Sequence, residues 1–196
     1  MKVMDIIMII LIGLGLAFEV LSVSVAQGSV LGDVKGRRIV LMCLMVCAWQ
    51  IVALTIGCWL ASLLPIEKYT HEVRMIWKLF AGIILIGLGG IKLFLIYFKK
   101  AVPEVRSDID FKRICGIASY TSIFTLFAGF AGGLMLLNAL HLGIMICVTT
   151  LGIVVVGVFV GYRNGELDKR VYWTGGILLI IAGILAIMQY IGWLVG

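Results

Sequence analysis

Six long apolar segments joined by short polar connections restrict the fold of this chain more than any other feature. They span about residues 4–28, 39–64, 75–98, 114–137, 140–161 and 172–194. A helix needs about 20 apolar residues to cross a hydrocarbon core of about 30 Å, and each segment is long enough. Hydrophobic residues make up 63% of the 196-residue chain. The sequence therefore predicts one all-α polytopic membrane domain, residues 1–196, with six transmembrane helices in a lipid bilayer.

The connections between these segments leave no room for a soluble catalytic domain, since the longest polar one is Lys99–Arg113. The sequence holds no nucleophile and base in a catalytic arrangement, no phosphate-binding loop and no pair of catalytic carboxylates. His141 falls in the expected turn between the fourth and fifth segments, beside Asn138, where a solvated residue is commoner than a ligand. We predict neither an enzyme nor a cofactor.

The lysines and arginines are unevenly distributed, and this asymmetry predicts the orientation of the chain. Most of them follow the first, third and fifth segments: Lys35, Arg37, Arg38, Lys99, Lys100, Arg106, Lys112, Arg113, Arg163, Lys169 and Arg170. The other connections and the N-terminus hold Lys2, Lys68, Arg74 and Lys78. The positive-inside rule then places both termini outside an inner (plasma) membrane. The net charge of +6 is thus a topology signal and predicts no nucleic-acid partner.

The two halves of the chain, residues 1–98 and 114–196, resemble each other weakly. Gly82-Ile-Ile-Leu-Ile-Gly-Leu-Gly89 in the third segment is similar to Gly176-Ile-Leu-Leu-Ile-Ile-Ala-Gly183 in the sixth. Because each half holds an odd number of segments, homologous halves must be inverted relative to each other. Inverted repeats of three helices are a recurrent design of transporters, with sites near the midplane where the halves meet.

Glycine and cysteine occur mostly inside the apolar segments. Glycine in membrane helices usually allows close approach of two backbones, and we expect this of Gly82, Gly87, Gly89, Gly90, Gly175, Gly176 and Gly183. Cys43 and Cys47 share a helix face at i, i+4. Buried cysteine most often behaves as a small apolar residue, which is the favoured interpretation, although two thiolates would also suit a soft metal.

Glu19 lies deep within the first apolar segment, in the run from Ile6 to Val25. A charged side chain at the centre of a membrane helix costs about 2.5–3.5 kcal/mol on insertion scales, and such residues usually face a bundle interior or a transport pathway. One interpretation is that Glu19 handles a transported ion. The other is that a protonated or paired Glu19 only helps the helices to pack.

Polar side chains at similar depth supply further oxygen atoms. Ser22 shares the face of Glu19 at i+3, and Gln50 lies near the middle of the second segment. The fourth segment carries Thr121 with Thr125 at i+4 and Ser119 with Ser122 at i+3. Carboxylate, hydroxyl and amide oxygens suit a hard cation such as Mn²⁺ or Mg²⁺. The alternative for each hydroxyl is a hydrogen bond to its own or a neighbouring helix.

Lys92 lies at nearly the same depth as Glu19, since the first and third segments run in the same direction. The two side chains could form an ion pair, which would neutralise the site and disfavour a divalent cation. Alternatively, the Lys92 ammonium reaches toward the inner surface while its stem stays in the apolar region. The sequence leaves both interpretations open.

Several segments together resemble the MntP-type manganese exporters of the LysE-like transporter group. The family's first-span pattern, similar to G-L-S-M-D-A-F-A-V-S, corresponds to Gly15-Leu-Ala-Phe-Glu19-Val-Leu-Ser-Val-Ser24. Further motifs match in the same order over nearly the whole chain: Trp49-Gln50, Thr55-Ile56-Gly57, Gly89-Gly90, Thr150-Leu151-Gly152 and Gly175-Gly176-Ile-Leu-Leu-Ile-Ile-Ala-Gly183.

The departures from the family pattern fall on its acidic residues. The first-span aspartate is Glu19 here, and the fourth-span pattern similar to T-S-I-D-A-L-A-V stands as Thr121-Ser122-Ile123-Phe124-Thr125-Leu126-Phe127-Ala128. Phe124 therefore takes the place of the second acid, and Leu95 stands where another acid is expected after the Gly-Gly pair. The basic residue after that pair is Lys92, one position late. A site built on several carboxylates keeps only Glu19.

The resemblance implies an exporter of a divalent cation, with Mn²⁺ as the favoured ion. Glu19 is the implied central ligand, Ser22, Gln50, Thr121 and Ser122 are supporting oxygen donors, and Lys92 is a charge partner. An alternative is a family member that has lost metal transport and exports another small solute. A further alternative is a membrane subunit or regulator without transport activity. The sequence leaves the oligomeric state open.

Overall fold

Six helices account for most of the residues that the computed structural model describes, which are 3–30, 36–64, 71–98, 111–164 and 169–195. They are α1 (Val3–Val30), α2 (Gly36–Ser62), α3 (His71–Phe98), α4 (Phe111–Leu134), α5 (Ala139–Asn164) and α6 (Lys169–Val195). Each predicted segment coincides with one helix. Five helices are long and apolar enough to cross a membrane, while the described apolar stretch of α4 is the shorter Ser122–Leu134. The predicted all-helical fold is therefore confirmed, and five of the six predicted spans are helices of the length and apolarity that a membrane requires.

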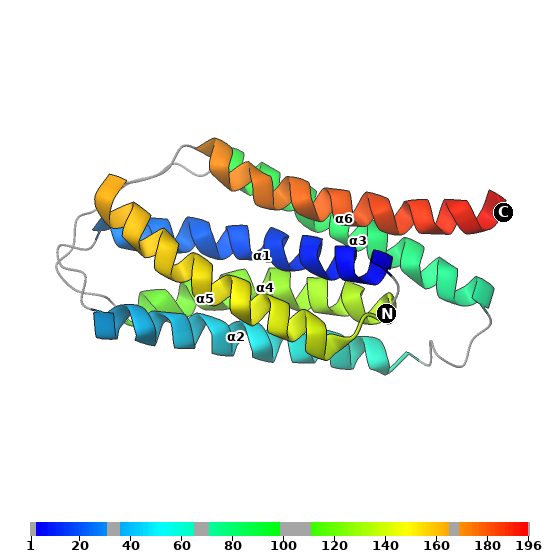
Figure 1. The fold of residues 1–196 in the computed structure, drawn as a ribbon, viewed down its shortest axis with the longest axis horizontal. Coiled ribbons are helices and arrows are strands. Elements are labelled where there is room, and N and C mark those ends of the chain that lie inside the picture. The colour runs from blue at the N-terminus through cyan, green and yellow to red at the C-terminus, as the bar shows by residue number, and fades with distance from the viewer. Residues whose placement is uncertain (1–2, 31–35, 65–70, 99–110, 165–168, 196) are drawn as a thin grey trace.

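The helices lie side by side, roughly along one axis (Figure 1). In Figure 1, α1, α3 and α5 run in one direction and α2, α4 and α6 in the other, and α1 begins at the end of the bundle where α6 finishes. The most extensive packing joins α1 with α5, α2 with α4, and α3 with α6. Each pair combines a helix from the first half of the chain with one from the second half, so the two halves are interleaved.

The seam between α3 and α6 shows why glycine is required in these helices. A Cβ atom added at Gly89 would lie 2.6 Å from the carbonyl oxygen of Gly176, and one added at Gly183 would lie 2.6 Å from the carbonyl oxygen of Gly82. Such distances leave no space for a side chain, so the two backbones are in direct contact. The expected close approach is confirmed at these four glycines, and Gly175 packs in the same way against Gly15 of α1.

Gly87 and Gly90 of α3 do not follow this expectation. A Cβ atom at either position would meet no other atom within 4 Å, and both residues are exposed. They lie on the outward face of α3, so the prediction of close helix packing is wrong for these two positions. Because the stretch of α3 around these glycines, residues 79–91, is apolar on all sides, its sequence did not distinguish the packed face from the outward face.

The connection between α4 and α5 differs from the predicted boundaries. α4 ends at Leu134 because Leu136 adopts a left-handed conformation with φ 57°, and the amides of Leu136 and Leu137 donate 3.0 Å hydrogen bonds to the carbonyls of Gly133 and Gly132. This is the Schellman pattern that terminates many helices. The Asn138 side chain then caps α5, because its Oδ1 accepts hydrogen bonds from the amides of Leu140 and His141. His141 therefore lies in the first turn of α5, and its prediction as a loop residue was wrong.

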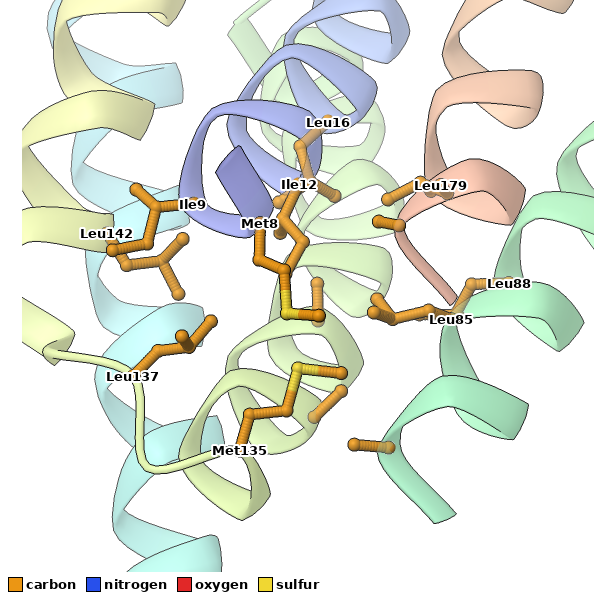
Figure 2. Packing of buried hydrophobic residues seen from close by; sticks show 14 of the residues in the cluster. Met8, Ile9, Ile12, Leu16, Leu85, Leu88, Met135, Leu137, Leu142 and Leu179 are labelled. Carbon is orange, nitrogen blue, oxygen red and sulfur yellow. The ribbon is translucent and has the colours of Figure 1, made fainter. Parts of the chain in front are cut away.

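A cluster of buried apolar side chains fills the half of the bundle where α1 begins and α4 ends. Figure 2 shows Ile12 and Met8 of α1 between Leu142 of α5 on one side and Leu85 and Leu179 of α3 and α6 on the other. All six helices contribute to the cluster. Its fully buried members come from α1, α3, α4, α5 and α6, while α2 contributes the slightly more exposed Leu54 and Ala61. This half of the bundle is therefore closed by apolar packing.

Candidate ion site at mid-depth

Buried polar groups lie at the middle of the bundle, at the edge of the apolar cluster. Gly15 of α1, Gln50 of α2, Ser122 of α4 and Thr150 of α5 are each close to the middle of their helix. Lys92 of α3 reaches the same depth because its ammonium bonds to the Gly15 carbonyl. All four polar side chains are buried. We call the Gly15 carbonyl and the side chains of Gln50, Lys92, Ser122 and Thr150 the mid-depth layer.

Lys92 links three helices within this layer. Its Nζ donates a 2.9 Å hydrogen bond to the carbonyl oxygen of Gly15 and lies 5.7 Å from the centroid of the Phe124 ring of α4. The residue is only 6% exposed. A carbonyl oxygen and an aromatic face both stabilise an ammonium that has left water. Lys92 therefore ties α3 to α1 and α4 near the centre of the protein.

This geometry is not the extended position of the Lys92 ammonium, which was one of the two interpretations that the sequence left open. The ammonium does not reach the inner surface, because it is buried against Gly15. The Glu19 side chain lies outside the described residues, so its pairing with Lys92 stays a prediction. In an α-helix the carbonyl of residue 15 also accepts the amide of residue 19. The Lys92 ammonium thus lies beside the turn of α1 that carries Glu19.

Phe124, which the family resemblance predicts to stand in place of an acid, packs within the apolar cluster with 6% of its surface exposed. Its ring offers the Lys92 ammonium an aromatic face but no oxygen ligand. The nearest described hydroxyl groups of α4 are those of Ser122, two residues earlier, and Thr125, the next residue, and both side chains are buried.

Gln50 and Thr150 are joined directly across the interface between α2 and α5. The Thr150 hydroxyl donates a 2.5 Å hydrogen bond to Oε1 of Gln50, and neither side chain is more than 2% exposed. The sequence singled out Gln50 but not Thr150 as a site residue. Two adjacent threonines in an apolar helix were the available signal, and only the structure shows which one faces inward. The hydroxyl of Thr149 donates instead to the Met145 carbonyl of its own helix.

Two further hydroxyl groups are fully buried and have no hydrogen-bond partner among the side chains and backbone that the structure describes: those of Ser24 on α1 and Thr125 on α4. Burying a hydroxyl without a partner costs free energy, so such groups call for a reason beyond packing. Thr125 belongs to the polar residues that the sequence indicated in the fourth segment, and Ser24 ends the first-span motif that contains Glu19. Their oxygens could accept a hydrogen bond from a water molecule at this depth.

The structure does not describe the side chains of three predicted ligands, so it does not test whether they belong to the mid-depth layer. Those of Glu19, Ser22 and Thr121 lie outside the described part of the structure, which gives only their positions within α1 and α4. Among the side chains that are described, no three of His, Cys, Asp or Glu lie close enough together to hold a metal ion. The donors that are described are carbonyl, amide and hydroxyl oxygens, which fit a hard cation better than a soft one.

The cysteines that the structure describes are free thiols within helices. Cys43 and Cys47 of α2 are buried, as expected for small apolar residues. Cys58, farther along α2, directs its Sγ to the Gly129 carbonyl at 3.4 Å. Their surroundings thus agree with the favoured interpretation of cysteine as a packing residue.

Comparison with known proteins assigns the family. A family model described as "Putative manganese efflux pump" matches residues 33–188. The chain belongs to this family. Among its relatives, the "Putative manganese efflux pump MntP" of Methanospirillum hungatei JF-1 is 31% identical over an alignment of 192 residues that covers 94% of each chain. The protein of the same name from Crocosphaera subtropica is 29% identical over an alignment of 186 residues that covers 92% of this chain and 94% of the relative. No solved structure matches the chain.

Membership of the MntP family agrees with the motifs from which the resemblance was inferred. A third relative, from Methanothermobacter thermautotrophicus, is 24% identical over 187 residues, or 95% of this chain and 97% of the relative. The relatives are named as efflux pumps, a class of transport protein and not of enzyme. These three relatives align with the chain along nearly their whole length.

Proposed function

We propose that this MntP-family protein exports Mn²⁺ from the cytoplasm across the inner membrane. The observation that carries the proposal is the mid-depth layer, in which oxygen donors on four helices lie buried within an otherwise apolar bundle. Polar groups at the centre of a membrane protein are costly and usually mark an ion or substrate pathway. The names of the relatives supply the direction of transport and the ion.

The packing of the helices supports an arrangement as two inverted repeats of three helices. A two-fold axis in the membrane plane would exchange α1 with α4, α2 with α5, and α3 with α6. This exchange converts the α1–α5 pair into the α4–α2 pair and leaves the α3–α6 pair unchanged. These are the three pairs with the most extensive packing. The contact of Gly89 with Gly176, and of Gly82 with Gly183, agrees with the same operation.

The asymmetry of the lysines and arginines supports both termini lying outside. In that orientation the apolar cluster around Ile12, Leu85 and Leu179 faces the outside, and the mid-depth layer lies beneath it. The structure then corresponds to a state that is sealed on the outer side. An ion held in the layer would leave to the outside only after helices around this apolar cluster separate.

Glu19 supplies the charge that this site needs. A divalent cation among neutral oxygens in a low-dielectric interior would be uncompensated, and a carboxylate on the adjacent turn of α1 lowers that cost. Gln50, Ser122 and the predicted Ser22 and Thr121 oxygens complete the ligand set. Glu19 is therefore the residue whose loss should affect transport most directly.

The test compares manganese tolerance of cells that produce the wild-type chain, Glu19→Gln or Glu19→Asp, with membrane insertion checked for each. We expect Glu19→Gln to abolish tolerance and Glu19→Asp to keep part of it, because Asp retains the charge on a shorter arm. Full tolerance with Glu19→Gln would show that the carboxylate only helps the helices to pack. No tolerance with the wild-type chain would favour another solute or a role without transport.

A further inference from the structure

The Lys92 ammonium holds a place that a transported cation would need. Its Nζ donates a 2.9 Å hydrogen bond to the Gly15 carbonyl oxygen, beside the turn of α1 that carries Glu19. An ammonium and a divalent cation are attracted by the same carbonyl and carboxylate oxygens. In a water-excluding interior, two cations a few ångströms apart repel each other strongly, and the repulsion doubles when one is divalent. The two cannot share this position.

The packing around Gly15 leaves little room for an ion to lie beside the ammonium. A Cβ atom at Gly175 of α6 would lie 3.0 Å from the Gly15 carbonyl oxygen, so α6 covers that oxygen on one side. A Cβ atom at Gly15 would lie 2.9 Å from the side chain of Leu179. Lys92 covers the carbonyl from α3. An ion that reaches this oxygen therefore has to displace Lys92.

The Lys92 side chain has a second position within its reach. α3 continues past Lys92 to Phe98, about 9 Å farther along the helix axis. A lysine near a helix end can keep its stem in the apolar region while the ammonium extends toward the interface. The position on Gly15 and an extended position toward the end of α3 are thus two alternatives for the same flexible side chain.

We propose that Lys92 is a tethered cation that fills the ion position in the ion-free protein, so that a divalent ion binds only when the ammonium leaves Gly15. The inference rests on the proposed function. Ion binding breaks the hydrogen bond between Lys92 of α3 and Gly15 of α1. When the ammonium returns, it displaces the ion from the same oxygen atoms. Lys92 therefore lowers the affinity for the ion and promotes its release.

The first test measures Mn²⁺ binding to the purified full-length protein by the electron paramagnetic resonance of free Mn²⁺. Lys92→Met keeps the apolar stem without the charge, and we expect it to lower the Kd for Mn²⁺ at least ten-fold. Lys92→Arg keeps the charge, so it should not show this gain in affinity. Lys78→Met is the matched control, because Lys78 lies about 21 Å away along α3 and bonds to Gln189.

Transport of Mn²⁺ into proteoliposomes separates this inference from the proposed function. We expect Lys92→Met to lower KM and kcat together, because the ion binds more tightly and leaves more slowly. If the wild type transports Mn²⁺ and Lys92→Met binds it no more tightly, the inference alone fails. If the wild type neither binds nor moves Mn²⁺, the proposed function fails and the inference fails with it.

A measurement on the wild-type protein covers the case in which Lys92→Met does not fold. Mass spectrometry reports how far a membrane-permeant amine reagent modifies Lys92 with and without Mn²⁺. We expect Mn²⁺ to increase modification of Lys92 at least three-fold and to leave Lys78 unchanged. Unchanged or reduced modification of Lys92 would overturn the inference. Lys92→Gln, which retains a donor for the Gly15 carbonyl without the charge, provides a second variant for the binding assay.

Discussion

Thr150 and Gln50 form a hydrogen bond of 2.5 Å that joins α5 to α2 at the centre of the bundle. Both side chains are buried, so each group lacks water as an alternative partner. We expect Thr150→Val, which keeps the shape and removes the hydroxyl, to lower the free energy of unfolding by about 1 kcal/mol, since the Gln50 oxygen is left unpaired. Chemical denaturation in detergent measures this change.

Thr149→Val is the control for this substitution. The Thr149 hydroxyl bonds to the Met145 carbonyl of its own helix and faces no other helix in this way. Its removal should change stability by less than half as much and leave manganese tolerance intact. Combining Gln50→Leu with Thr150→Val should cost less than the sum of the single changes. Strict additivity would show that the bond contributes nothing to the joining of α2 and α5.

The glycines of α3 give a second prediction, because they face different surroundings on one helix. Gly89→Ala adds a methyl group 2.6 Å from the Gly176 carbonyl oxygen, so α3 and α6 have to move apart. We expect a loss of about 1–3 kcal/mol in the free energy of unfolding, the usual cost of overpacking. Thermal unfolding in detergent, followed by circular dichroism, measures it.

Gly87→Ala is the matched control on the same helix. A methyl group there meets no other atom within 4 Å, and alanine favours helix over glycine by up to about 1 kcal/mol. Gly87→Ala should therefore leave stability unchanged or increase it. Equal losses at Gly87 and Gly89 would contradict the packing of α3 on α6 at this seam.

The sequence predicted the helices well because their length and apolarity are dictated by the membrane. Counting residues along each segment also predicted the depth at which Gln50, Ser122 and Lys92 lie, while their role as a site stays a prediction. The direction in which each side chain points, toward another helix or outward, was harder to predict. In a helix that is apolar all around, no polar face distinguishes Gly89 from Gly90 or Thr150 from Thr149, and a flexible side chain such as Lys92 has two favourable positions. These choices are made by contacts between helices far apart in sequence.

Orientation in the membrane is a third prediction, and it follows from the positions of the basic residues. In a background without the five native cysteines, a cysteine placed at His71 should react with an impermeant thiol reagent added from outside. A cysteine placed at Ser107 should react only after the membrane is permeabilised. Labelling of whole cells followed by mass shift on a gel measures both. The reverse pattern would place the apolar cluster on the cytoplasmic side.

Phe124 gives the last prediction, because its ring lies beside Lys92 and the family resemblance predicts an acid at this position. Phe124→Asp puts a carboxylate near the Lys92 ammonium, which now lies 5.7 Å from the ring centroid. The second negative charge should raise Mn²⁺ export in vesicles several-fold. Truncating a buried Phe to Ala costs about 3–5 kcal/mol, so the free energy of unfolding should fall. The fall should be smaller than this if the new carboxylate pairs with Lys92.

Phe124→Asn separates the effect of charge from the effect of the lost ring. It has nearly the size of the aspartate variant but no charge, so it should lose as much stability or more and gain no export. Parallel measurement of Mn²⁺ uptake into inverted vesicles and of thermal stability distinguishes the two substitutions. If both variants lose stability and neither gains export, Phe124 has closed the ion cavity. Such a result would count against manganese export as the function of this chain, because a second carboxylate at mid-depth would then have no ion to bind.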